Sequence, residues 1–404
     1  MNFFNKNKLA SIRSSLHHPL DSMTLLKKNI FIIAIESGSS IWMKNLNPVK
    51  NDTLPSLMPF LDSLSQKSVA FPNAYTTGIR SIEGITAVFG GVPTFDEMVL
   101  MTSPYFTNSF DTPANLLKKE GYATRFYFGG NHGSFNIDQT LKIFGFDEII
   151  SREEYGNEKD YDGGWGIWDH KMGEYAARDI TTLPQPFIAG WFTLNPHGPF
   201  DVPDDWETEG YVSTDPMKKT VEYEDRAIRH FFDVAKMQPW YDNTIFVIVA
   251  DHGCRDLKET IYDSSFILPH ITLMIFSPDG SLPPQRIENI AVSQLDIAST
   301  LIDLAGYPRD YISLGHNMLS PSHPGYAIMF IHGAFQICSA QYAVRLSADM
   351  KRIEGVYDIR SDFEMKRPLS RFDGKEVNRM VEWGRAFLQD YSERINNDRL
   401  SFNS

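Results

Sequence analysis

The sequence predicts an α/β fold, in which helices flank a mainly parallel central sheet and a small C-terminal subdomain adds an antiparallel sheet and a helix. Short, nearly continuous apolar runs recur along most of the chain, and stretches with helical periodicity separate them. Such runs are typical of strands buried on both faces, and their alternation with helices is typical of a parallel sheet. After about Pro324 short segments of alternating polarity follow, and these indicate antiparallel strands.

The first buried strand is predicted where NIFIIAI runs from Asn29 to Ile35 and stops at Glu36. Ligands of parallel sheets gather at the carboxyl ends of the strands, so the residues just after each apolar run are the first candidates for function. Further strands of the same kind are predicted over residues 122–128, 187–194, 244–250 and 271–276.

The clearest helix is VEYEDRAIRHFFDVAK, which carries apolar side chains on one face and Glu222, Asp225 and Arg229 on the other. Other helices are predicted over residues 55–67, 113–120, 293–305 and 376–394, the last of them in the C-terminal subdomain. The same pattern divides the chain into a lead-in segment at residues 1–27, a main domain at 28–323 and the C-terminal subdomain at 324–404.

The composition excludes several classes of protein. With 38 basic and 51 acidic residues the net charge is -13, so we expect the surface to repel nucleic acid, and an anionic substrate needs help from a metal or from clustered Arg and His. The only cysteines, Cys254 and Cys338, exclude a disulfide scaffold but leave a single bridge open. No apolar run of about 18 residues is present, and the N-terminus lacks a signal-peptide core. We expect either a cytoplasmic protein or the soluble part of a longer chain.

Candidate metal ligands follow two of the predicted strands. Glu36 ends the first, and Asp251 and His252 come directly after TIFVIVA, followed by Gly253, which lets the backbone turn sharply. Two carboxylates and an imidazole at one sheet edge suit one divalent metal, Mn²⁺ or Zn²⁺, and accept Mg²⁺. The alternative is that each residue caps a nearby helix or turn.

The segment NAYTTGIRSIEGITAVFGGVP places Ser81 beside Arg80 among several glycines. An alcohol becomes a good nucleophile when a metal or a base takes its proton. If Ser81 begins a helix, the helical N–H groups and the Arg80 guanidinium would stabilise a phosphoryl group. The alternative is a loop followed by a helix that Ser81 merely caps.

Three further residues are candidates for substrate binding. His197, in NPHGPF, follows a strand and could donate to a phosphoryl oxygen or protonate a leaving alcohol. His132, in GGNHGSF, holds the equivalent place after another strand, although a loop histidine is more often simply exposed. Trp165, in DGGWGIWDH, could line a sugar or glycerol face or belong to the core.

These segments, taken in order, resemble a known family. NIFIIAIES, TTGIRSIEG, FTLNPHGPF, WYDNTIFVIVADHG, ITLMIFSPDG and VSQLDIASTLIDLAGYP are similar to the lipoteichoic acid synthase and phosphoglycerol transferase group of the alkaline phosphatase and sulfatase superfamily. The resemblance covers residues 28–319 and implies a fold of that superfamily. It further implies that Glu36, Asp251 and His252 hold one catalytic metal, that Ser81 is the nucleophile and also a ligand, and that His197 contacts the substrate phosphate.

The sequence departs from the family pattern at two places and from the sulfatase branch at a third. Ser81 stands where the family usually has Thr. The family's Trp and Arg that bind phosphoglycerol would fall near residues 135–138, where SFNID has neither. The sulfatase branch makes its nucleophile from a C/S-x-P-x-R segment, whereas Ser81 is followed by IEGI, so we expect no formylglycine and no sulfate-ester hydrolysis by that route.

The resemblance implies a two-step transferase. A phosphoglycerol-type or phosphoethanolamine group would pass from a phospholipid donor to Ser81 and then to a glycan or lipid acceptor. Two alternatives stay open: a phosphodiesterase that gives the group to water, and a noncatalytic domain that binds glycans or lipid head groups. The family also implies an extracytoplasmic location, with membrane contact through a segment that this sequence does not contain.

Overall fold

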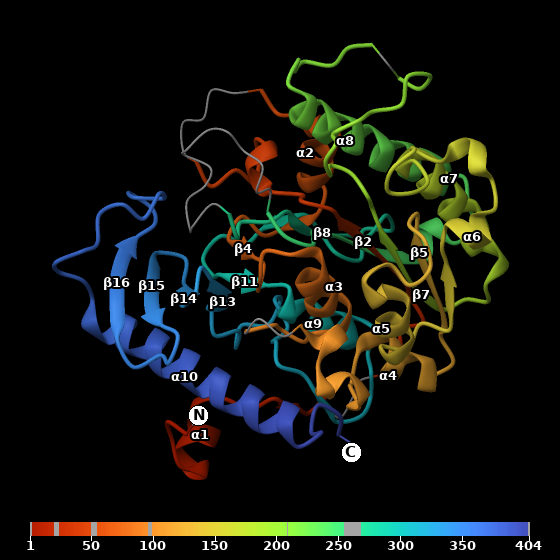
Figure 1. Cartoon of the computed structure of the whole chain (residues 1–404). Helices are drawn as coiled ribbons and strands as arrows, with labels where there is room; N and C mark the ends of the chain where they lie inside the picture. Colours follow the sequence, from red (N-terminus) through yellow and green to blue (C-terminus); the bar gives the residue numbers. More distant parts are fainter. Residues whose placement is uncertain are drawn as a thin grey trace.

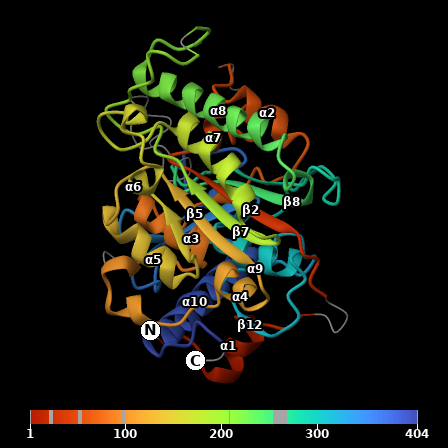
Figure 2. The ribbon, with the colours of Figure 1, turned by 90° about the vertical axis from the view of Figure 1, so that its right-hand side faces the viewer.

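An eight-stranded sheet forms the centre of the molecule (Figures 1 and 2). The computed structural model describes residues 2–19, 24–49, 55–95, 99–207, 209–253 and 268–402. Neighbouring strands β8, β2, β7, β5 and β6 are parallel, whereas β9 is antiparallel to both β8 and β3. In sheet order the strands are β10 (Gln285–Arg286), β3 (Val69–Ala70), β9 (Leu273–Phe276), β8 (Thr244–Ala250), β2 (Asn29–Ile35), β7 (Phe187–Phe192), β5 (Ala123–Phe128) and β6 (Glu148–Ile150). The predicted fold class is confirmed, with an antiparallel strand near one edge.

Helices cover both faces of this sheet (Figures 1 and 2). Alternate side chains of β2 enter two separate hydrophobic cores: Ile30 and Ile32 join one, and Phe31 and Ile33 join the other. Because both faces are buried, the strand sequence is apolar at every position after Asn29. One face is covered by α2 (Pro59–Ser65), α7 (Asp169–Asp179) and α8 (Pro216–Ala235), and the other by α3 (Ser81–Gly90), α4 (Pro113–Lys119), α5 (Ile137–Ile143) and α9 (Leu295–Leu304).

The polar face of α8 differs from what its sequence indicates. Glu222 and Asp225 are buried, and each carboxylate accepts hydrogen bonds from two backbone N–H groups. Asp225 accepts the N–H groups of Phe60 and Leu61, both at 2.9 Å, and so joins α8 to the start of α2. Glu222 and Asp225 on the second face of α8 therefore hold neighbouring segments from inside the protein, whereas Arg229 on that face is exposed.

The C-terminal part forms the predicted antiparallel sheet and helix. Strands β13 (Ala327–Ile331), β14 (Ala334–Cys338), β15 (Tyr342–Ser347) and β16 (Ile353–Asp358) pair in that order, and α10 (Gly374–Asn396) packs against β14 and β15 (Figure 1). Apolar side chains of α10 and some of those of the strands join the same core as α3 and α9, whereas Ala327, Met329 and Ile331 of β13 belong to the other core. Cys338 is a buried free thiol, and Cys254 lies outside the described residues.

The lead-in segment packs on this C-terminal part and on the main sheet domain. Helix α1 (Lys6–Ile12) contacts α10, and β1 (Leu16–His17) pairs with β12 (Tyr311–Ile312). The short remaining elements are α6 (Arg152–Tyr155) and the parallel pair β4 (Ala74–Tyr75) and β11 (Val292–Ser293).

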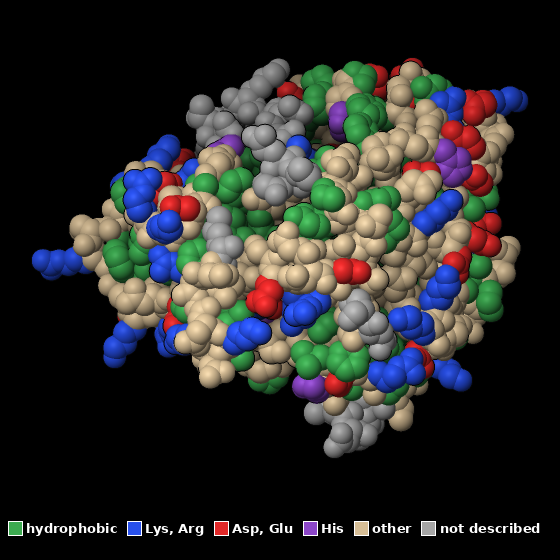
Figure 3. Space-filling view, turned by 60° about the horizontal axis from the view of Figure 1, so that its bottom comes forward, with side chains coloured by type: hydrophobic (Ala, Val, Ile, Leu, Met, Phe, Trp, Pro, Cys, Tyr) green, Lys and Arg blue, Asp and Glu red, His purple; other side chains and the backbone are tan. Residues whose placement is uncertain are grey.

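The face that carries α10 mixes basic and acidic side chains (Figure 3). On this face Lys and Arg lie among Asp and Glu, so the negative net charge is not gathered there. Within the described part of the chain, no helix combines the length and the apolar character needed to cross a bilayer.

Candidate metal centre and active site

The register of the parallel strands brings Glu36 and Asp251 together. Ile35, the last residue of β2, pairs with Ala250, the last residue of β8, and the Asp251 N–H donates to the Ile35 carbonyl at 3.1 Å. Both carboxylates are therefore at the carboxyl end of the sheet, with exposed fractions of 4% for Glu36 and 0% for Asp251. Two buried acids in direct proximity require a positive charge or a shared proton.

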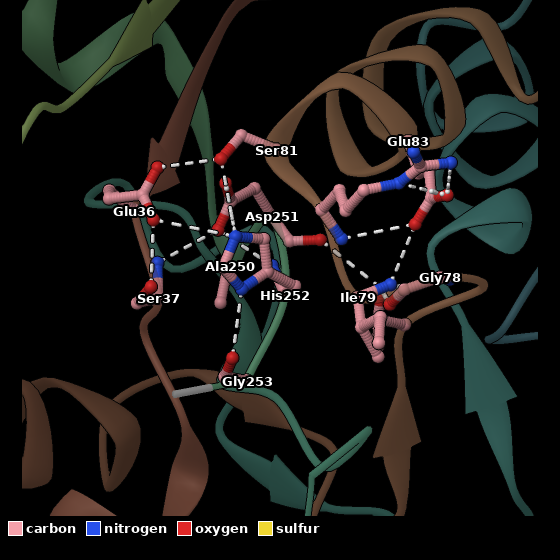
Figure 4. A network of polar contacts seen from close by, with 12 residues as sticks. Glu36, Ser37, Gly78, Ile79, Ser81, Glu83, Ala250, Asp251, His252 and Gly253 are labelled. Atoms are coloured by element: carbon pink, nitrogen blue, oxygen red, sulfur yellow. Dashed lines mark hydrogen bonds and ion pairs between the residues drawn. The ribbon is translucent and has the colours of Figure 1, made fainter. Parts of the chain in front are cut away.

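The third member of this cluster is His252, whose ring nitrogens have different partners (Figure 4). Nδ1 lies 2.8 Å from the Gly253 carbonyl oxygen, so this nitrogen carries the proton and donates. Nε2 then faces Glu36 Oε1 at 3.4 Å and Asp251 Oδ2 at 3.5 Å with its lone pair. A backbone carbonyl that orients the ring in this way is the usual support of a metal-binding histidine.

Ser81 lies over this cluster as the first residue of α3. Its Oγ donates to Glu36 Oε2 at 2.9 Å and lies 3.2 Å from His252 Nε2 (Figure 4). The cap position belongs to Arg80, so Ser81 does not serve as the helix cap. The close approach of α3 depends on Gly84, because a Cβ there would meet the Asp251 carbonyl oxygen at 2.1 Å.

The donor set of the cluster fits a divalent cation. Asp251 Oδ1 accepts from the N–H groups of Ser37 at 2.8 Å and His252 at 2.6 Å, whereas Asp251 Oδ2 is buried and has no hydrogen-bond partner among the described residues. Burial and the nearby Glu36 carboxylate raise the pKa of Asp251 to about 8. One ligand atom from each of Glu36, Asp251 and His252 lies within 4.8 Å of the others. A cation among these atoms would satisfy the orphaned oxygen and offset the paired negative charges.

A cavity of about 260 Å³ opens in front of Ser81. Its lining has a polar part, which consists of Glu36, Ser37, Arg80, Ser81, His197 and His252, and an apolar part. The Arg80 guanidinium is paired with Glu83, with Arg80 Nε 2.7 Å from Glu83 Oε1, and Glu83 also accepts the Arg80 backbone N–H at 3.0 Å. The apolar part consists of Ile82, Phe128, Phe135, Ile137, Trp165, Phe192, Leu194 and Pro196.

Trp165 and His197 line this cavity as a pair. Their rings tilt against each other with centroids 4.0 Å apart. Trp165 Nε1 donates to the Gly198 carbonyl oxygen at 2.6 Å, and His197 Nδ1 lies 2.9 Å from the same oxygen. Trp165 thus packs on His197 at the cavity and is not a buried core residue.

Replacing Trp165 with alanine is expected to lower kcat/KM for a phosphodiester roughly three- to tenfold, since an aromatic contact contributes about 0.5–1.5 kcal/mol. The melting temperature should stay close to that of the wild type, because Trp165 is 38% exposed. Trp165→Phe keeps the ring contact and loses the hydrogen bond to Gly198, so its kcat/KM in steady-state assays should lie between those of the wild type and Trp165→Ala. Equal kcat/KM for wild type and Trp165→Ala would show that the ring does not hold His197.

The structure does not bring His132 to this cavity. Its Nε2 lies 2.7 Å from Glu154 Oε1, and its Nδ1 lies 3.7 Å from Asp138 Oδ2. The hydrogen bond to Glu154 raises the pKa of His132. Glu154 of α6 holds the imidazole, and the described lining of the cavity does not include His132.

Several polar residues that support the cluster were not among the candidates predicted from the sequence. The Ser37 hydroxyl donates to Glu36 Oε1 at 2.7 Å. The Thr193 hydroxyl accepts the Glu36 N–H at 3.0 Å, and Gln294 Nε2 donates to the Asp251 carbonyl oxygen at 2.6 Å. Ser37 could have been found from the sequence, because it directly follows the candidate ligand Glu36. Thr193 and Gln294 lie in the quoted segments FTLNPHGPF and VSQLDIASTLIDLAGYP, but these segments are distant in sequence from Glu36 and Asp251, and their spacing does not link them to the cluster.

The fold and the cluster define a class of protein: an α/β domain of the alkaline phosphatase superfamily, with a serine at a helix N-terminus facing a two-carboxylate, one-histidine site. The family model described as Sulfatase matches residues 28–307, and the chain belongs to this family. The solved structure described as a protein in the alkaline phosphatase superfamily from Vibrio parahaemolyticus is 25% identical, with a TM-score of 0.83 and coverage of 98% of each chain. The lipoteichoic acid synthase LtaP from Listeria monocytogenes shares the fold, with a TM-score of 0.75, 18% identity and coverage of 98% of this chain and 99% of that one.

Curated relatives are enzymes of one group. The chain is 27% identical over 327 residues to the lipoteichoic acid synthase-like YvgJ of Bacillus subtilis (strain 168), an alignment that covers 75% of this chain and 51% of that protein. It is 25% identical over 296 residues to phosphoglycerol transferase I of Salmonella choleraesuis (strain SC-B67), covering 67% of this chain and 37% of that protein. The chain thus spans about half the length, or less, of these relatives.

Proposed function

We propose that this domain is a metal-dependent phosphotransferase that moves a phosphoglycerol-type or phosphoethanolamine group from a phospholipid to a glycan or lipid acceptor through phosphorylated Ser81. The observation that carries the proposal is the position of Ser81 Oγ, 2.9 Å from Glu36 Oε2 and 3.2 Å from His252 Nε2, at the start of a helix and beside a cavity. The name phosphoglycerol transferase supports the phosphoglycerol head group, and the name lipoteichoic acid synthase supports a glycan or lipid acceptor.

Glu36, Ser81, Asp251 and His252 would hold one divalent metal, for which we propose Mn²⁺, with Zn²⁺ or Mg²⁺ as substitutes. Such an ion, when bound, lowers the pKa of a coordinated hydroxyl and neutralises charge on phosphoryl oxygens.

The side chains divide the reaction between them. In the first step Ser81 Oγ gives its proton to Glu36 Oε2, to which it already donates at 2.9 Å, and forms a bond with phosphorus as the bond between phosphorus and the leaving alcohol oxygen breaks. His197 gives that leaving oxygen a proton. In the second step the acceptor hydroxyl gives its proton to His197 and attacks phosphorus, the bond between phosphorus and Ser81 Oγ breaks, and Ser81 Oγ takes its proton back from Glu36. The N-terminal N–H groups of α3 and the guanidinium of Arg80 would bind the non-bridging oxygens.

The proposal also covers the residue range of the catalytic domain and the location of the protein. We propose that residues 28–323 carry the catalysis, that residues 324–404 form a subdomain on it, and that the domain works outside the cytoplasmic membrane. The location follows from the family of the relatives, and the phospholipid donor would be met at the membrane surface.

The test is incubation of the protein and Mn²⁺ with vesicles that contain labelled phosphatidylglycerol or phosphatidylethanolamine. We expect diacylglycerol to be released and a modified Ser81 peptide to appear in mass spectra after acid quenching. An added acceptor alcohol should capture the head group in competition with water. Capture by water alone would make the protein a phosphodiesterase, and no release from either lipid, with the metal bound, would contradict the proposed donor class.

A further inference from the structure

A buried carboxylate lies behind the loop that carries His197, here called the His197 loop (residues 193–200). Asp169, the first residue of α7, is 1% exposed, and the reaction proposed above does not use it. An aspartate at the start of a helix usually stabilises that helix through its N–H groups. Here both carboxylate oxygens accept hydrogen bonds from the His197 loop, which follows β7.

Asp169 binds the part of the loop that precedes His197. Its Oδ1 accepts the Leu194 N–H at 2.9 Å, and its Oδ2 accepts the Asn195 N–H at 2.9 Å and the Asn195 side-chain amide at 3.0 Å. Leu194 and Asn195 are buried, whereas His197 is exposed. Buried N–H groups need an acceptor, and a carboxylate is a strong one. One side chain therefore holds the backbone just before His197.

Trp165 binds the part of the loop that follows His197. Its ring lies against the imidazole, and its Nε1 donates to the Gly198 carbonyl oxygen at 2.6 Å. Trp165 and Asp169 belong to the same short segment, which leads into α7. This segment, residues 165–169, therefore contacts the loop on both sides of His197.

The segment 165–169 is itself fixed to the central sheet. The Ile167 N–H donates to the carbonyl of Gly129, just after β5, at 3.0 Å, and the Ile167 side chain is fully buried. A Cβ at Gly166 would meet the same carbonyl oxygen at 2.1 Å, so the close approach requires glycine. Helix α7 then packs along α8 (Figure 2). The contacts with the His197 loop are thus made from a support that belongs to the sheet and its helices.

We propose that Asp169 is a positioning residue for His197: with Trp165 of the same segment it holds the His197 loop, and so keeps the imidazole where it can protonate the leaving alcohol. A displacement of a reacting group by about 1 Å can lower a rate roughly 100-fold. The inference rests on the proposed function for its kinetic readout, whereas amide exchange reports on the same contacts without turnover.

The test compares Asp169→Leu with Asp169→Asn. Leucine has a similar size and leaves the N–H groups of Leu194 and Asn195 without their acceptor, whereas asparagine keeps one acceptor oxygen. Each variant is assayed with Mn²⁺ on labelled phosphatidylglycerol, which has an alcohol leaving group, and on bis(p-nitrophenyl) phosphate. The p-nitrophenolate leaving group needs no proton, so its release does not depend on a well-placed acid.

Asp169→Leu should lower kcat for the lipid roughly 10- to 100-fold, with KM changed less than about twofold, and kcat for bis(p-nitrophenyl) phosphate less than about threefold. Asp169→Asn should lie between Asp169→Leu and the wild type, and it carries the test if the leucine variant does not fold. His197→Gln should show the same selective loss, and combining it with Asp169→Leu should add little to that loss, because both act through one imidazole.

The matched control is Asp225→Asn. Asp225 is also a buried carboxylate that accepts two backbone N–H groups of a distant segment, but that segment is α2. This variant should lose thermal stability and keep the wild-type ratio of kcat for the two diesters, because a loss of folded protein lowers both rates equally.

Amide exchange and the NMR signals of the His197 ring judge the inference apart from activity. Asp169→Asn should speed exchange at Leu194 and Asn195 about tenfold and shift the His197 signals, and Asp225→Asn should change neither. Equal loss on both diesters, or wild-type exchange in Asp169→Asn, would overturn the proposal. Absence of turnover in the wild type would count against the proposed function alone, and exchange and the His197 signals would then decide the inference.

Discussion

Replacing Ser81 with alanine is expected to abolish head-group transfer, with kcat reduced at least about 10³-fold, because no other hydroxyl takes the place of the attacking oxygen. Ser81 Oγ is the atom that contacts both Glu36 and His252, and its removal leaves the supports of those two residues intact. The fold should persist, since Ser81 is a helix-terminal residue that does not cap α3. Product release from labelled lipid, divalent-metal content and melting temperature measure the three effects.

The matched control is Ser81→Thr, which keeps a hydroxyl on the same carbon. We expect this variant to retain activity within about tenfold of the wild type, because the nucleophile is preserved and only a methyl group is added. Mn²⁺ should still bind to Ser81→Ala, since two carboxylates and His252 remain. Wild-type turnover in Ser81→Ala would show that the nucleophile is a different residue.

The cluster of Glu36, Asp251 and His252 could be predicted from the sequence, because neighbouring parallel strands end at the same edge of a sheet. Once NIFIIAI and TIFVIVA are recognised as neighbouring buried strands, Glu36 and Asp251 must emerge at the same edge. Ser81 was likewise marked by its glycines, and Gly84 shows why, since it allows α3 to approach the Asp251 carbonyl. Predictions of this kind depend on backbone geometry and need no knowledge of side-chain packing.

The supports of the cluster could not be predicted, because they depend on contacts between distant segments. The periodicity of α8 placed Asp225 on a polar face, but the structure buries that face, along with Glu224, against α2, α7 and the strand ends. His132 shows the converse case. Its loop position after a strand is equivalent to that of His197, but Glu154 of α6 holds its ring and the described lining of the cavity does not include it. Amphipathic pattern and strand-end position alone do not distinguish a ligand contact from an internal hydrogen bond.

Asp251→Asn is expected to remove most of the bound metal and at the same time to stabilise the metal-free protein. The asparagine side-chain oxygen still accepts the N–H groups of Ser37 and His252, as Asp251 Oδ1 does. The lost group is the buried, unpartnered Oδ2 and its charge. We expect Mn²⁺ affinity to fall at least about 100-fold, because the Asp251 carboxylate is one of the two carboxylates that offset the charge of the ion.

The stability effect has a definite pH dependence. In the metal-free protein the pKa of Asp251 is raised from 3.8 to about 8, so its contribution to stability is fully present below pH 3.8 and is lost as the pH rises through about 8. The asparagine side chain of the variant would not titrate, and at pH 8 with EDTA we therefore expect Asp251→Asn to be more stable than the wild type by about 1–3 kcal/mol. Added Mn²⁺ should reverse that order, because it stabilises only the protein that binds it. Melting curves at pH 5 and pH 8, each with EDTA or Mn²⁺, measure both effects, and full metal occupancy in Asp251→Asn would show that Asp251 is not a ligand.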